Sequence, residues 1–324
     1  TTSAYGTYIY YANNGPRIVG NLVKGQAYGL RLYRPNYSHY VFDVDWPNAR
    51  VYNNMFISAR TSTSTSYGAY IYYPCYLDFW NNNVIVNSTG STSYGVYIST
   101  SSSYPNVYVQ NNMIASTNSS YASRLFYMNN TAPLREFDNN LYYTPYGTGG
   151  TCFYLGSSSY SWNTLPKTTW NTNSVWGEPY FDDDLNDLHS RSPQGYQNGI
   201  PIAVIADDYD GDLRHPTTPC IGADEYPQPP DEYDMAVVKA QLTYATNKWA
   251  RNAGTAMHKA RVVLRNVGLL DDPATITVGI SDAPMTTIGD AMLSETFSPS
   301  WDATHSAVVE FSTPITGLAE TPSG

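Results

Sequence analysis

The 324-residue sequence predicts an all-β protein in which a coil of short strands is followed by a β-sandwich. Two phrases that recur every few tens of residues predict the coil, because self-similarity at such a period is typical of solenoids. A shift in composition after residue 226, followed by alternating apolar residues, predicts the second domain. We therefore expect the coil over residues 1–226, a proline-rich linker over 227–233 and the sandwich over 234–324.

The first recurring phrase is a tyrosine-glycine strand. Its copies begin at Tyr5, Tyr28, Tyr67 and Tyr94, with a degenerate copy at Tyr121. Because successive strand residues point to opposite faces, each copy separates into two sides. The side expected to face the core carries Ile9, Leu32, Ile71, Ile98 and Leu125. The outward side carries Tyr8, Arg31, Tyr70, Tyr97 and Arg124, and two residues later Tyr10, Tyr33, Tyr72, Ser99 and Phe126.

The second recurring phrase is an asparagine-rich step into an apolar residue. Its aligned asparagines are Asn21, Asn54, Asn83, Asn112 and Asn140, which lie 33, 29, 29 and 28 residues apart. Asparagine tolerates the left-handed backbone of a sharp turn, and its amide can hydrogen-bond to the same group in the next rung. We interpret these residues as a structural ladder and not as a catalytic site.

Two apolar columns flank the ladder, and we expect both to face inward. The column before it reads Ile18, Val51, Trp80, Val109 and Phe137, and the column after it reads Leu22, Met55, Val84, Met113 and Leu141. The repeats show neither the 3.6-residue period of helices nor the regular leucine spacing of leucine-rich repeats. Short strands separated by serine, threonine, asparagine and glycine runs indicate a parallel β-helix.

Composition narrows the classes of function. The formal net charge is −10, and without a basic stripe to neutralise phosphates a nucleic-acid partner is disfavoured. No apolar run approaches the roughly 18 residues that span a bilayer, so we expect no membrane span.

The cysteines Cys75, Cys152 and Cys220 allow one disulfide at most, and their pairing stays open. Solenoids with this polar, tyrosine-rich composition are typically secreted or on the cell surface, so we expect an extracellular location.

The segment from Asn186 to Tyr226 carries the sharpest motif of the chain. It reads Asn-Asp-Leu-His at 186–189, Ser-Pro at 192–193, Asp-Tyr-Asp-Gly-Asp-Leu-Arg at 208–214 and Cys-Ile-Gly-Ala-Asp-Glu-Tyr at 220–226. This pattern resembles the closing segment of secreted bacterial right-handed parallel β-helix repeat proteins. The resemblance covers residues 1–226 and implies a right-handed coil. Its motif residues are Asp208, Asp210, Arg214, Asp224 and Glu225, and we expect Asp208 or Asp210 to pair with Arg214.

Beyond the linker, alternating apolar residues predict the strands of the sandwich. They occur at 235–238, 260–264, 275–278 and 307–311. The run Val262-Val263-Leu264-Arg265-Asn266-Val267-Gly268 resembles the strand and turn of immunoglobulin-like adhesion modules of bacterial surface proteins. Such sandwiches have seven or more strands. We therefore expect an immunoglobulin-like domain that lacks a terminal strand.

Many right-handed β-helices cleave acidic polysaccharides, so a lyase or glycosidase must be weighed. The carboxylates of the repeats, Asp43, Asp45, Asp78, Glu136 and Asp138, do not share one column, and the five histidines lack metal-ligand spacing. The best local acidic cluster, 182–184 with Asp187 and His189, has the composition of a solvated turn. A Ca²⁺ site at Asp208, Asp210 and Asp212 would lack the bidentate glutamate of a calcium loop. No other cofactor is expected.

We therefore expect a non-catalytic extracellular structural or adhesive protein, with self-association into a head-to-tail filament as the leading hypothesis. The expected interaction surface is Tyr8, Tyr10, Arg31, Tyr33, Tyr70, Tyr72, Tyr97 and Arg124. Rigid tyrosine rings suit protein association and sugar stacking alike, and they also stabilise a sheet through rung-to-rung contacts. The alternatives are a polysaccharide-binding module and a lyase or glycosidase acting along the groove of the β-helix.

Overall fold

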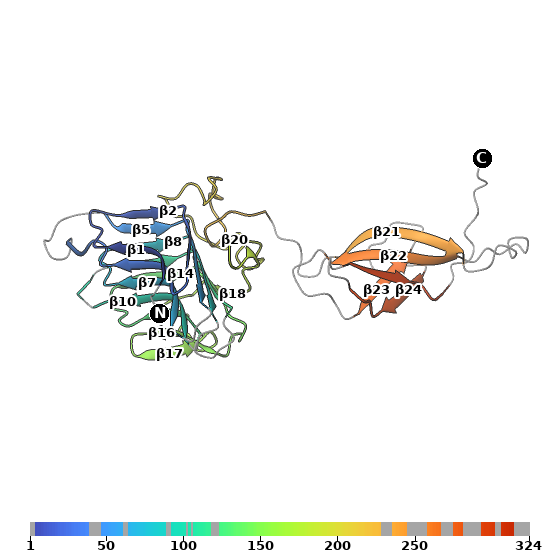
Figure 1. Cartoon of the computed structure of the whole chain (residues 1–324), viewed down its shortest axis with the longest axis horizontal. Helices are drawn as coiled ribbons and strands as arrows, with labels where there is room; N and C mark the ends of the chain where they lie inside the picture. Colours follow the sequence, from blue (N-terminus) through green and yellow to red (C-terminus); the bar gives the residue numbers. More distant parts are fainter. Residues whose placement is uncertain are drawn as a thin grey trace, which may run out of the picture. The chain divides into compact units, whose positions relative to one another are not determined.

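The structure is a computed structural model of the chain. It describes residues 4–38, 47–60, 64–88, 92–101, 103–104, 106–117, 123–227, 235–244, 258–266, 275–280, 293–301 and 306–313. The chain divides into two compact units, Thr1–Pro229 and Pro230–Gly324 (Figure 1). The expected linker beyond Pro227 and the first two residues of the degenerate phrase, Tyr121 and Ala122, lie outside the described residues.

The first unit is built from three sheets, mainly of parallel strands, that form the sides of one coil. The first sheet contains β1 (Tyr5–Tyr10), β4 (Tyr28–Tyr33), β7 (Ser66–Tyr72), β10 (Ser93–Ser99), β13 (Ser123–Met128) and β16 (Thr151–Leu155), with β17 (Ser158–Ser161) antiparallel at its edge. The second contains β2 (Arg17–Val19), β5 (Ala49–Tyr52), β8 (Leu77–Trp80), β11 (Val107–Gln110) and β14 (Leu134–Asp138). The third contains β3 (Leu22–Gly25), β6 (Met55–Arg60), β9 (Asn83–Ser88), β12 (Met113–Ser116), β15 (Leu141–Tyr143) and β18 (Val175–Trp176).

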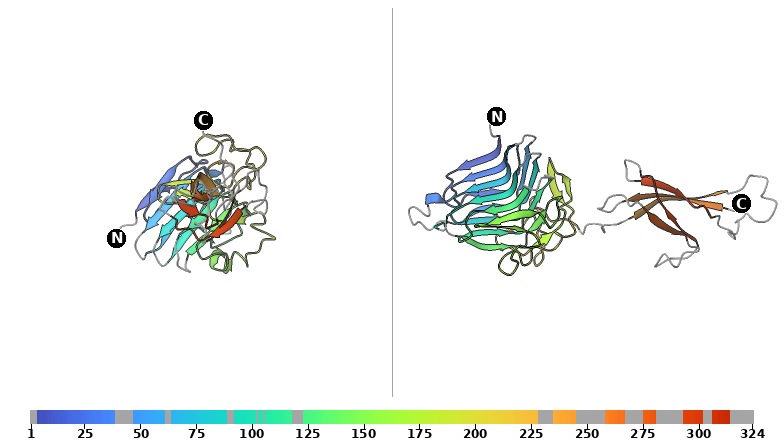
Figure 2. Two further views of the ribbon diagram at one scale, coloured as in Figure 1. Left: turned by 90° about the vertical axis from the view of Figure 1, so that its right-hand side faces the viewer. Right: turned by 90° about the horizontal axis from the view of Figure 1, so that it is seen from below.

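Successive passages of the chain add one strand to each sheet in turn, so the backbone coils around a common apolar interior (Figure 2). This solenoid of parallel sheets has the arrangement of a parallel β-helix, as the repeated phrases predict. The glycine of the tyrosine-glycine phrase permits the close stacking of its rungs. A Cβ atom on Gly68 would lie 2.7 Å from the carbonyl oxygen of Gly95 and 2.4 Å from Val84.

The asparagine ladder differs from the prediction at its third rung. Hydrogen bonds between side-chain amides connect Asn21, Asn54, Asn82, Asn112 and Asn140, with Nδ2–Oδ1 distances of 2.9–3.0 Å. Beyond the ladder, the backbone N–H of Asn140 donates to the hydroxyl of Ser174. Asn83 is therefore not a ladder residue. Three consecutive asparagines, 81–83, make the alignment ambiguous in the sequence, and the register of strands resolves it.

The left-handed backbone also belongs to a different residue from the one predicted. Positive φ angles occur one position before the ladder, at Gly20, Asn53, Asn81, Asn111 and Asn139. Each turn thus uses two neighbouring positions, one for the bend and one for the amide ladder. We refer to Asn53, Asn81, Asn111 and Asn139 as the turn asparagines.

The two apolar columns on either side of the asparagine ladder also differ from the prediction. Phe79, and not Trp80, aligns with Val51 and Val109 in the second sheet and is fully buried in the core. In the third sheet the interior is filled by Phe56, Val84, Ile114 and Tyr142. The column of Leu22, Met55, Asn83, Met113 and Leu141 points to the opposite side of that sheet. Met55, Met113 and Leu141 are nevertheless buried, because another segment covers them.

That cover is the closing segment, which we define as residues 178–226. It contains the antiparallel pair β19 (Phe181–Asp183) and β20 (Asp187–Ser190) and packs Leu188, Ile221 and Ala223 against the outside of the third sheet. The far end of the coil is covered by a different stretch. There Trp162 and Leu165 are buried against the last rung, with Trp170 and Trp176 beside them.

The fifth copy of the tyrosine-glycine phrase is shifted relative to the prediction. Arg124 aligns with Tyr94, Tyr127 with Tyr97, and Met128 with Ile98. Leu125 is therefore replaced by Met128 in the aliphatic column, and Phe126 is buried in the core instead of facing outward. The shift extends the outward aromatic column through β13 and β16, since Tyr127 aligns with Tyr97 and with Tyr154.

The second unit contains two antiparallel sheets. One is formed by β21 (Met235–Tyr244), β22 (His258–Asn266) and β25 (Ser306–Glu310), and the other by β23 (Ile276–Ile280) and β24 (Leu293–Phe297). Apolar residues of both sheets share one core around Val262, Leu264 and Phe311. The predicted strand segments are present as strands, and β24 is additional. The expected absence of a terminal strand concerns residues 314–324, which lie outside the described residues.

Two further features concern the whole chain. The three cysteines lie among the described residues, are buried and form no disulfide. Burial raises the pKa of the Cys152 thiol to about 12 and that of Cys220 to about 11, so both are protonated at neutral pH. The described part of the chain contains no helix with the length and apolar character needed to cross a membrane.

Candidate functional site

The outward side of the first sheet carries three columns of mostly aromatic residues, which we call the tyrosine face. Parallel, in-register pairing aligns Tyr5, Tyr28, Tyr67, Tyr94 and Arg124 in the first column. The second column is Tyr8, Arg31, Tyr70, Tyr97, Tyr127 and Tyr154. The third column is Tyr10, Tyr33, Tyr72 and Ser99. All eight predicted interaction residues lie on this face, although Arg124 belongs to the first column and not the second.

Within each column the rings stack on one another from rung to rung. Centroid distances are 5.1 Å for Tyr67–Tyr94, 5.0 Å for Tyr70–Tyr97 and 4.4 Å for Tyr97–Tyr127, with interplanar angles of 8°, 8° and 3°. Rings of neighbouring columns meet nearly at right angles, at 80° for Tyr67–Tyr70. The ring faces are therefore largely covered by other rings, and the edges and hydroxyl groups remain at the surface.

The arginines of the face are engaged by the tyrosines around them. The Arg31 guanidinium lies 4.8 Å from the ring centroid of Tyr8 and 5.5 Å from that of Tyr28, and its Nη1 donates to the hydroxyl of Tyr5 at 2.6 Å. Arg124 lies 5.5 Å from the Tyr94 ring centroid. In these cation–π contacts the guanidinium groups are attracted to the negative faces of the aromatic rings. The arginines thus contribute to the stack itself.

The face is uncharged apart from these two arginines. Burial raises the pKa of Tyr67 and Tyr97, and neighbouring tyrosines raise it further, because two phenolates cannot ionise side by side. The hydroxyl groups of Tyr67 and Tyr97 are therefore neutral hydrogen-bonding groups at physiological pH. Exposure is greatest at the first rung, where Tyr8 is 44% and Tyr10 is 60% exposed.

The carboxylates considered for catalysis do not converge on the coil. Asp78 is buried, accepts a hydrogen bond from Asn48 at 2.7 Å and pairs with Arg50 at 3.4 Å. Asp138 accepts hydrogen bonds from the backbone and side-chain amides of Asn173. Asp78 therefore pairs with the aligned residue of the neighbouring strand, and Asp138 holds the turn that precedes β18. Asp43 and Asp45 lie outside the described residues.

The acidic run 182–184 lines a cavity of about 450 Å³ between the closing segment and the third sheet, together with Tyr143, Glu178 and Arg191. Burial raises the pKa of Asp184, and Asp183 raises it further. Asp182 pairs with Arg191 at 3.0 Å, and Asp183 caps the turn at Leu185 and Asn186. Two of these three aspartates thus have structural partners.

The turn asparagines attach the closing segment to the coil. The Nδ2 group of Asn53 donates to Asp207 O at 2.8 Å, that of Asn81 to Gly222 O at 3.2 Å, and that of Asn111 to Ile200 O at 2.7 Å. Asn83 acts on the same segment, because its amide donates to Leu188 O and accepts from Ala223 N. The paired asparagines of each repeat are the sequence signal for this role, which the sequence interpretation missed.

Arg214 fixes the end of the closing segment, with a partner different from the one predicted. Its guanidinium is 5% exposed and pairs with Glu225 at 3.2 Å, not with Asp208 or Asp210. It also donates to Asn53 Oδ1 and to the carbonyl oxygens of Gly222 and Ala223 at 2.9–3.0 Å. One buried cation thus joins the motif to the second turn of the coil.

Asp208 has a structural task of its own. Its Oδ1 accepts backbone N–H bonds from Asp210 and Asp212 at 3.0 and 2.9 Å, and its Oδ2 accepts from Glu225 N–H at 2.8 Å. A carboxylate held by three N–H groups has little capacity left for a cation. The proposed calcium ligands Asp208, Asp210 and Asp212 are thus distributed over different local roles.

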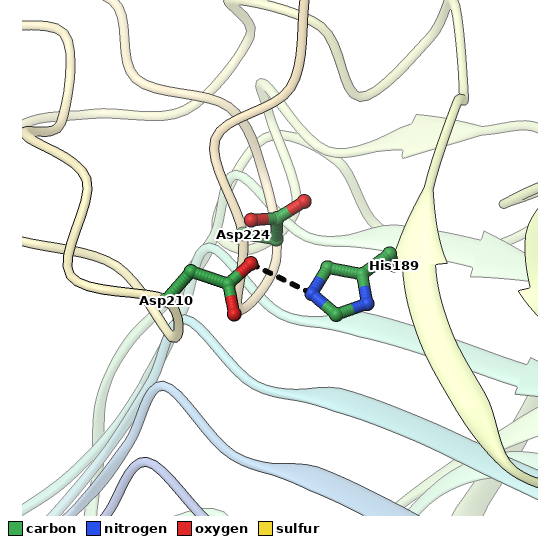
Figure 3. A group of neighbouring side chains, drawn as sticks. All are labelled: His189, Asp210 and Asp224. Carbon is green, nitrogen blue, oxygen red and sulfur yellow. Dashed lines mark hydrogen bonds and ion pairs between the residues drawn. The ribbon is translucent and has the colours of Figure 1, made fainter.

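A different set of metal-ligating side chains converges nearby (Figure 3). One ligand atom each from His189, Asp210 and Asp224 lies within 4.8 Å of the others. His189 Nε2 is 2.8 Å from Asp210 Oδ2, and His189 Nδ1 bonds to Asp187. Burial raises the pKa of Asp224 to about 7; the charge of His189 lowers it, and that of Asp208 raises it.

Of the residues selected from the sequence, the structure brings the interaction residues together on one face and the closing-motif residues together at one end of the closing segment. It does not assemble the repeat carboxylates that it describes, Asp78, Glu136 and Asp138, into a site. Comparisons with models of known protein families, with curated proteins and with solved structures found no match to this chain.

Proposed function

We propose that this chain is a non-catalytic extracellular structural or adhesive protein that associates with a second copy of itself through the tyrosine face. In this proposal the coil is a right-handed parallel β-helix and the second unit is an immunoglobulin-like module. The observation that supports the proposal is the continuous tyrosine face, an ordered and nearly uncharged array of rings and hydroxyl groups.

The array suits a copy of itself because its features repeat at the rung spacing of a sheet, about 4.8 Å. Two such faces present edges and hydroxyl groups at the same interval, and tyrosine contributes rigid contact area at little entropic cost. A symmetric, face-to-face contact closes upon itself. Head-to-tail stacking of coils is less well supported, since Trp162 and Leu165 cover the far end.

Glycan binding is the second candidate, and the first rung favours it. Tyr8 and Tyr10 are the most exposed rings of the face, and a sugar ring stacks on an exposed aromatic surface. In the middle rungs the rings cover one another, which leaves little face for a sugar. A lyase or glycosidase is not supported by any convergent pair of carboxylates among the described residues of the coil.

The association is tested by sedimentation of the full chain over a range of concentrations. We expect a dimer that dissociates on dilution, and we expect the double variant Tyr70→Ser, Tyr97→Ser to shift the equilibrium toward monomer. Tyr108→Ser, on the second sheet, is the matched control and should associate like the parent chain. Circular dichroism of each variant verifies that the coil is folded.

A chain that stays monomeric at all concentrations would contradict the self-association proposal. The same preparation can then be applied to a glycan array. Retention without release of reducing or unsaturated ends would assign the face to glycan binding, whereas release of such ends would identify an enzyme.

A further inference from the structure

We propose that His189, Asp210 and Asp224 bind one divalent transition-metal ion, with Zn²⁺ as the representative case, and that this ion fastens the closing segment. The proposed site is independent of the tyrosine face and of the function proposed for it. Its three ligands come from β20, from the loop at 207–213 and from the end of the closing segment (Figure 3).

The ligand atoms lie close to the spacing of a coordination shell without yet adopting it. The three atoms lie within 4.8 Å of one another, and His189 Nε2 and Asp210 Oδ2 are 2.8 Å apart. Ligand atoms about 2.0–2.2 Å from a zinc ion are separated from each other by distances of this order. Small side-chain movements therefore suffice to place an ion between them.

The imidazole of His189 is oriented by a carboxylate outside the ligand set. Asp187 accepts from His189 Nδ1, which leaves Nε2 facing Asp210 and Asp224. This arrangement, in which a carboxylate holds the rear nitrogen of a ligating histidine, is the usual support for a metal-bound imidazole. It fixes the tautomer that presents a lone pair to the ion.

Asp224 supplies the observation that points most directly to a missing cation. Its side chain is 94% buried, since only 6% of it is exposed. Among the described residues no N–H or O–H group of the backbone or of a neutral side chain donates to it, and its charged neighbours are His189, Asp210 and Asp208. A buried carboxyl beside another carboxyl requires either a proton or a cation.

The groups around the cluster carry more negative than positive charge. Four aspartates, at positions 187, 208, 210 and 224, surround the single imidazole of His189. Arg214, on the same segment, forms its ion pair with Glu225 at 3.2 Å and not with one of these aspartates. A divalent cation would offset the excess of negative charge at the point where three passages of the closing segment meet.

The ligand set selects the class of metal. An imidazole nitrogen with two carboxylates suits Zn²⁺, Mn²⁺, Co²⁺ or Fe²⁺, whereas Ca²⁺ and Mg²⁺ prefer an all-oxygen shell. On binding, the ion replaces the proton between His189 Nε2 and Asp210, so the proton is released to the buffer. The affinity should therefore rise with pH.

Isothermal titration of the chelator-treated full chain with ZnCl₂ and, separately, with CaCl₂ tests the proposal. We expect one Zn²⁺ per chain, a heat that changes with the ionisation enthalpy of the buffer, and no saturable Ca²⁺ binding. Asp210→Asn, at a side chain that is half exposed, should abolish or strongly weaken Zn²⁺ binding. Asp187→Asn should weaken it about 10–100-fold, the usual cost of losing a partner of a ligating histidine.

His215→Gln is the matched control, because His215 lies on the same closing segment but accepts only from nearby threonines. This variant should bind Zn²⁺ like the parent chain. Zn²⁺ should also slow hydrogen exchange at 207–213 in the parent chain and not in Asp210→Asn. Absence of saturable Zn²⁺ binding, or binding that Asp210→Asn and His189→Gln leave unchanged, would overturn the proposal and assign the cluster to proton binding alone.

Discussion

Paired asparagines perform two separate tasks at each corner between the second and third sheets. The first of the pair takes a positive φ and reaches out to the closing segment, as Asn111 does toward Ile200. The second stacks its amide along the coil, as Asn112 does toward Asn140 at 3.0 Å. Both tasks use properties that asparagine combines, namely tolerance of the left-handed region and an amide that donates and accepts.

The two roles predict different effects for two adjacent substitutions. Asn82→Ala removes amide bonds to Val51 O, Trp80 O and Asn112 Oδ1 and leaves buried backbone groups without partners. Each such group costs about 1–3 kcal/mol, so we expect the free energy of unfolding of the coil to fall by about 3 kcal/mol. Urea unfolding followed by circular dichroism measures this loss.

Asn83→Ala is the matched comparison, because Asn83 is equally buried but bonds to the closing segment. We expect faster hydrogen exchange around Leu188 and Ala223, with the rungs of the coil less affected. Equal loss of rung stability in the two variants would show that the ladder assignment is wrong.

At the scale of elements, the closing segment is held on the third sheet by polar bonds distributed along its length and by apolar contacts beneath it. Leu188 and Ala223 pack on Met55, Ile57 and Ile85 of the third sheet. The outward column of that sheet is therefore buried although it faces away from the coil interior. Apolar residues on both sides of a strand are typical of sheets covered on both faces.

Substitution of Arg214 tests how the closing segment is attached to the coil. Arg214→Met removes a buried cation that bonds to Glu225, Asn53 and two carbonyl groups, and breaking such a pair costs about 3–5 kcal/mol. We expect the closing segment to exchange its amide hydrogens and to be cut by protease more readily than in the parent chain.

Arg191→Met is the control at the same scale. Arg191 and its partner Asp182 are 57% and 48% exposed, and an exposed ion pair contributes about 1 kcal/mol or less. Similar protease sensitivity in the two variants would argue that charge alone, and not the buried bonds of Arg214, holds the segment.

At the scale of the whole molecule, the stability of the coil should depend on pH through the His189 cluster. Burial raises the folded-state pKa of Asp224 to about 7, and the charge of Asp208 adds to the shift against the opposing effect of His189. Burial lowers the pKa of His189, but its hydrogen bonds to Asp187 and Asp210 raise it overall. In both cases the folded state holds its proton to higher pH than the unfolded chain does.

The sign of the effect follows from proton binding. Between about pH 4 and pH 7 the folded chain binds more protons than the unfolded chain, so stability is highest at the acidic end and falls as pH rises. The lowered pKa values of Asp183 and Asp187 act in the opposite sense, but below this window. We expect the thermal midpoint of the metal-free chain to fall between about pH 5 and pH 8.

Asp224→Asn isolates the contribution of this residue, because an amide has no proton to lose. The variant should show a flatter profile than the parent chain, and an unchanged slope would exclude Asp224 as the source. Adding Zn²⁺ should stabilise the parent chain more at the alkaline end, where metal binding no longer competes with protons.

The sequence by itself determined the all-β character, the coil and its outward tyrosine columns. These three features can be read from local sequence. The repeated phrase indicates the coil, and the alternation of residues within each phrase separates the inward column from the outward one, which recurs in every rung. It also identified the closing motif, although not the partner of Arg214. Its errors at Asn83 and Trp80 are alignment offsets of one residue, and its error at Leu125 is an offset of three residues. Local pattern carries no information about strand register at these positions.

Only the tertiary structure decided which asparagine stacks, which column is covered and which side chains meet. His189 lies 21 residues from Asp210, and Asn53 lies 154 residues from Asp207, so their contacts depend on the path of the closing segment over the third sheet. Contacts of that separation are set by the packing of a whole element against the coil. No spacing within one repeat encodes them.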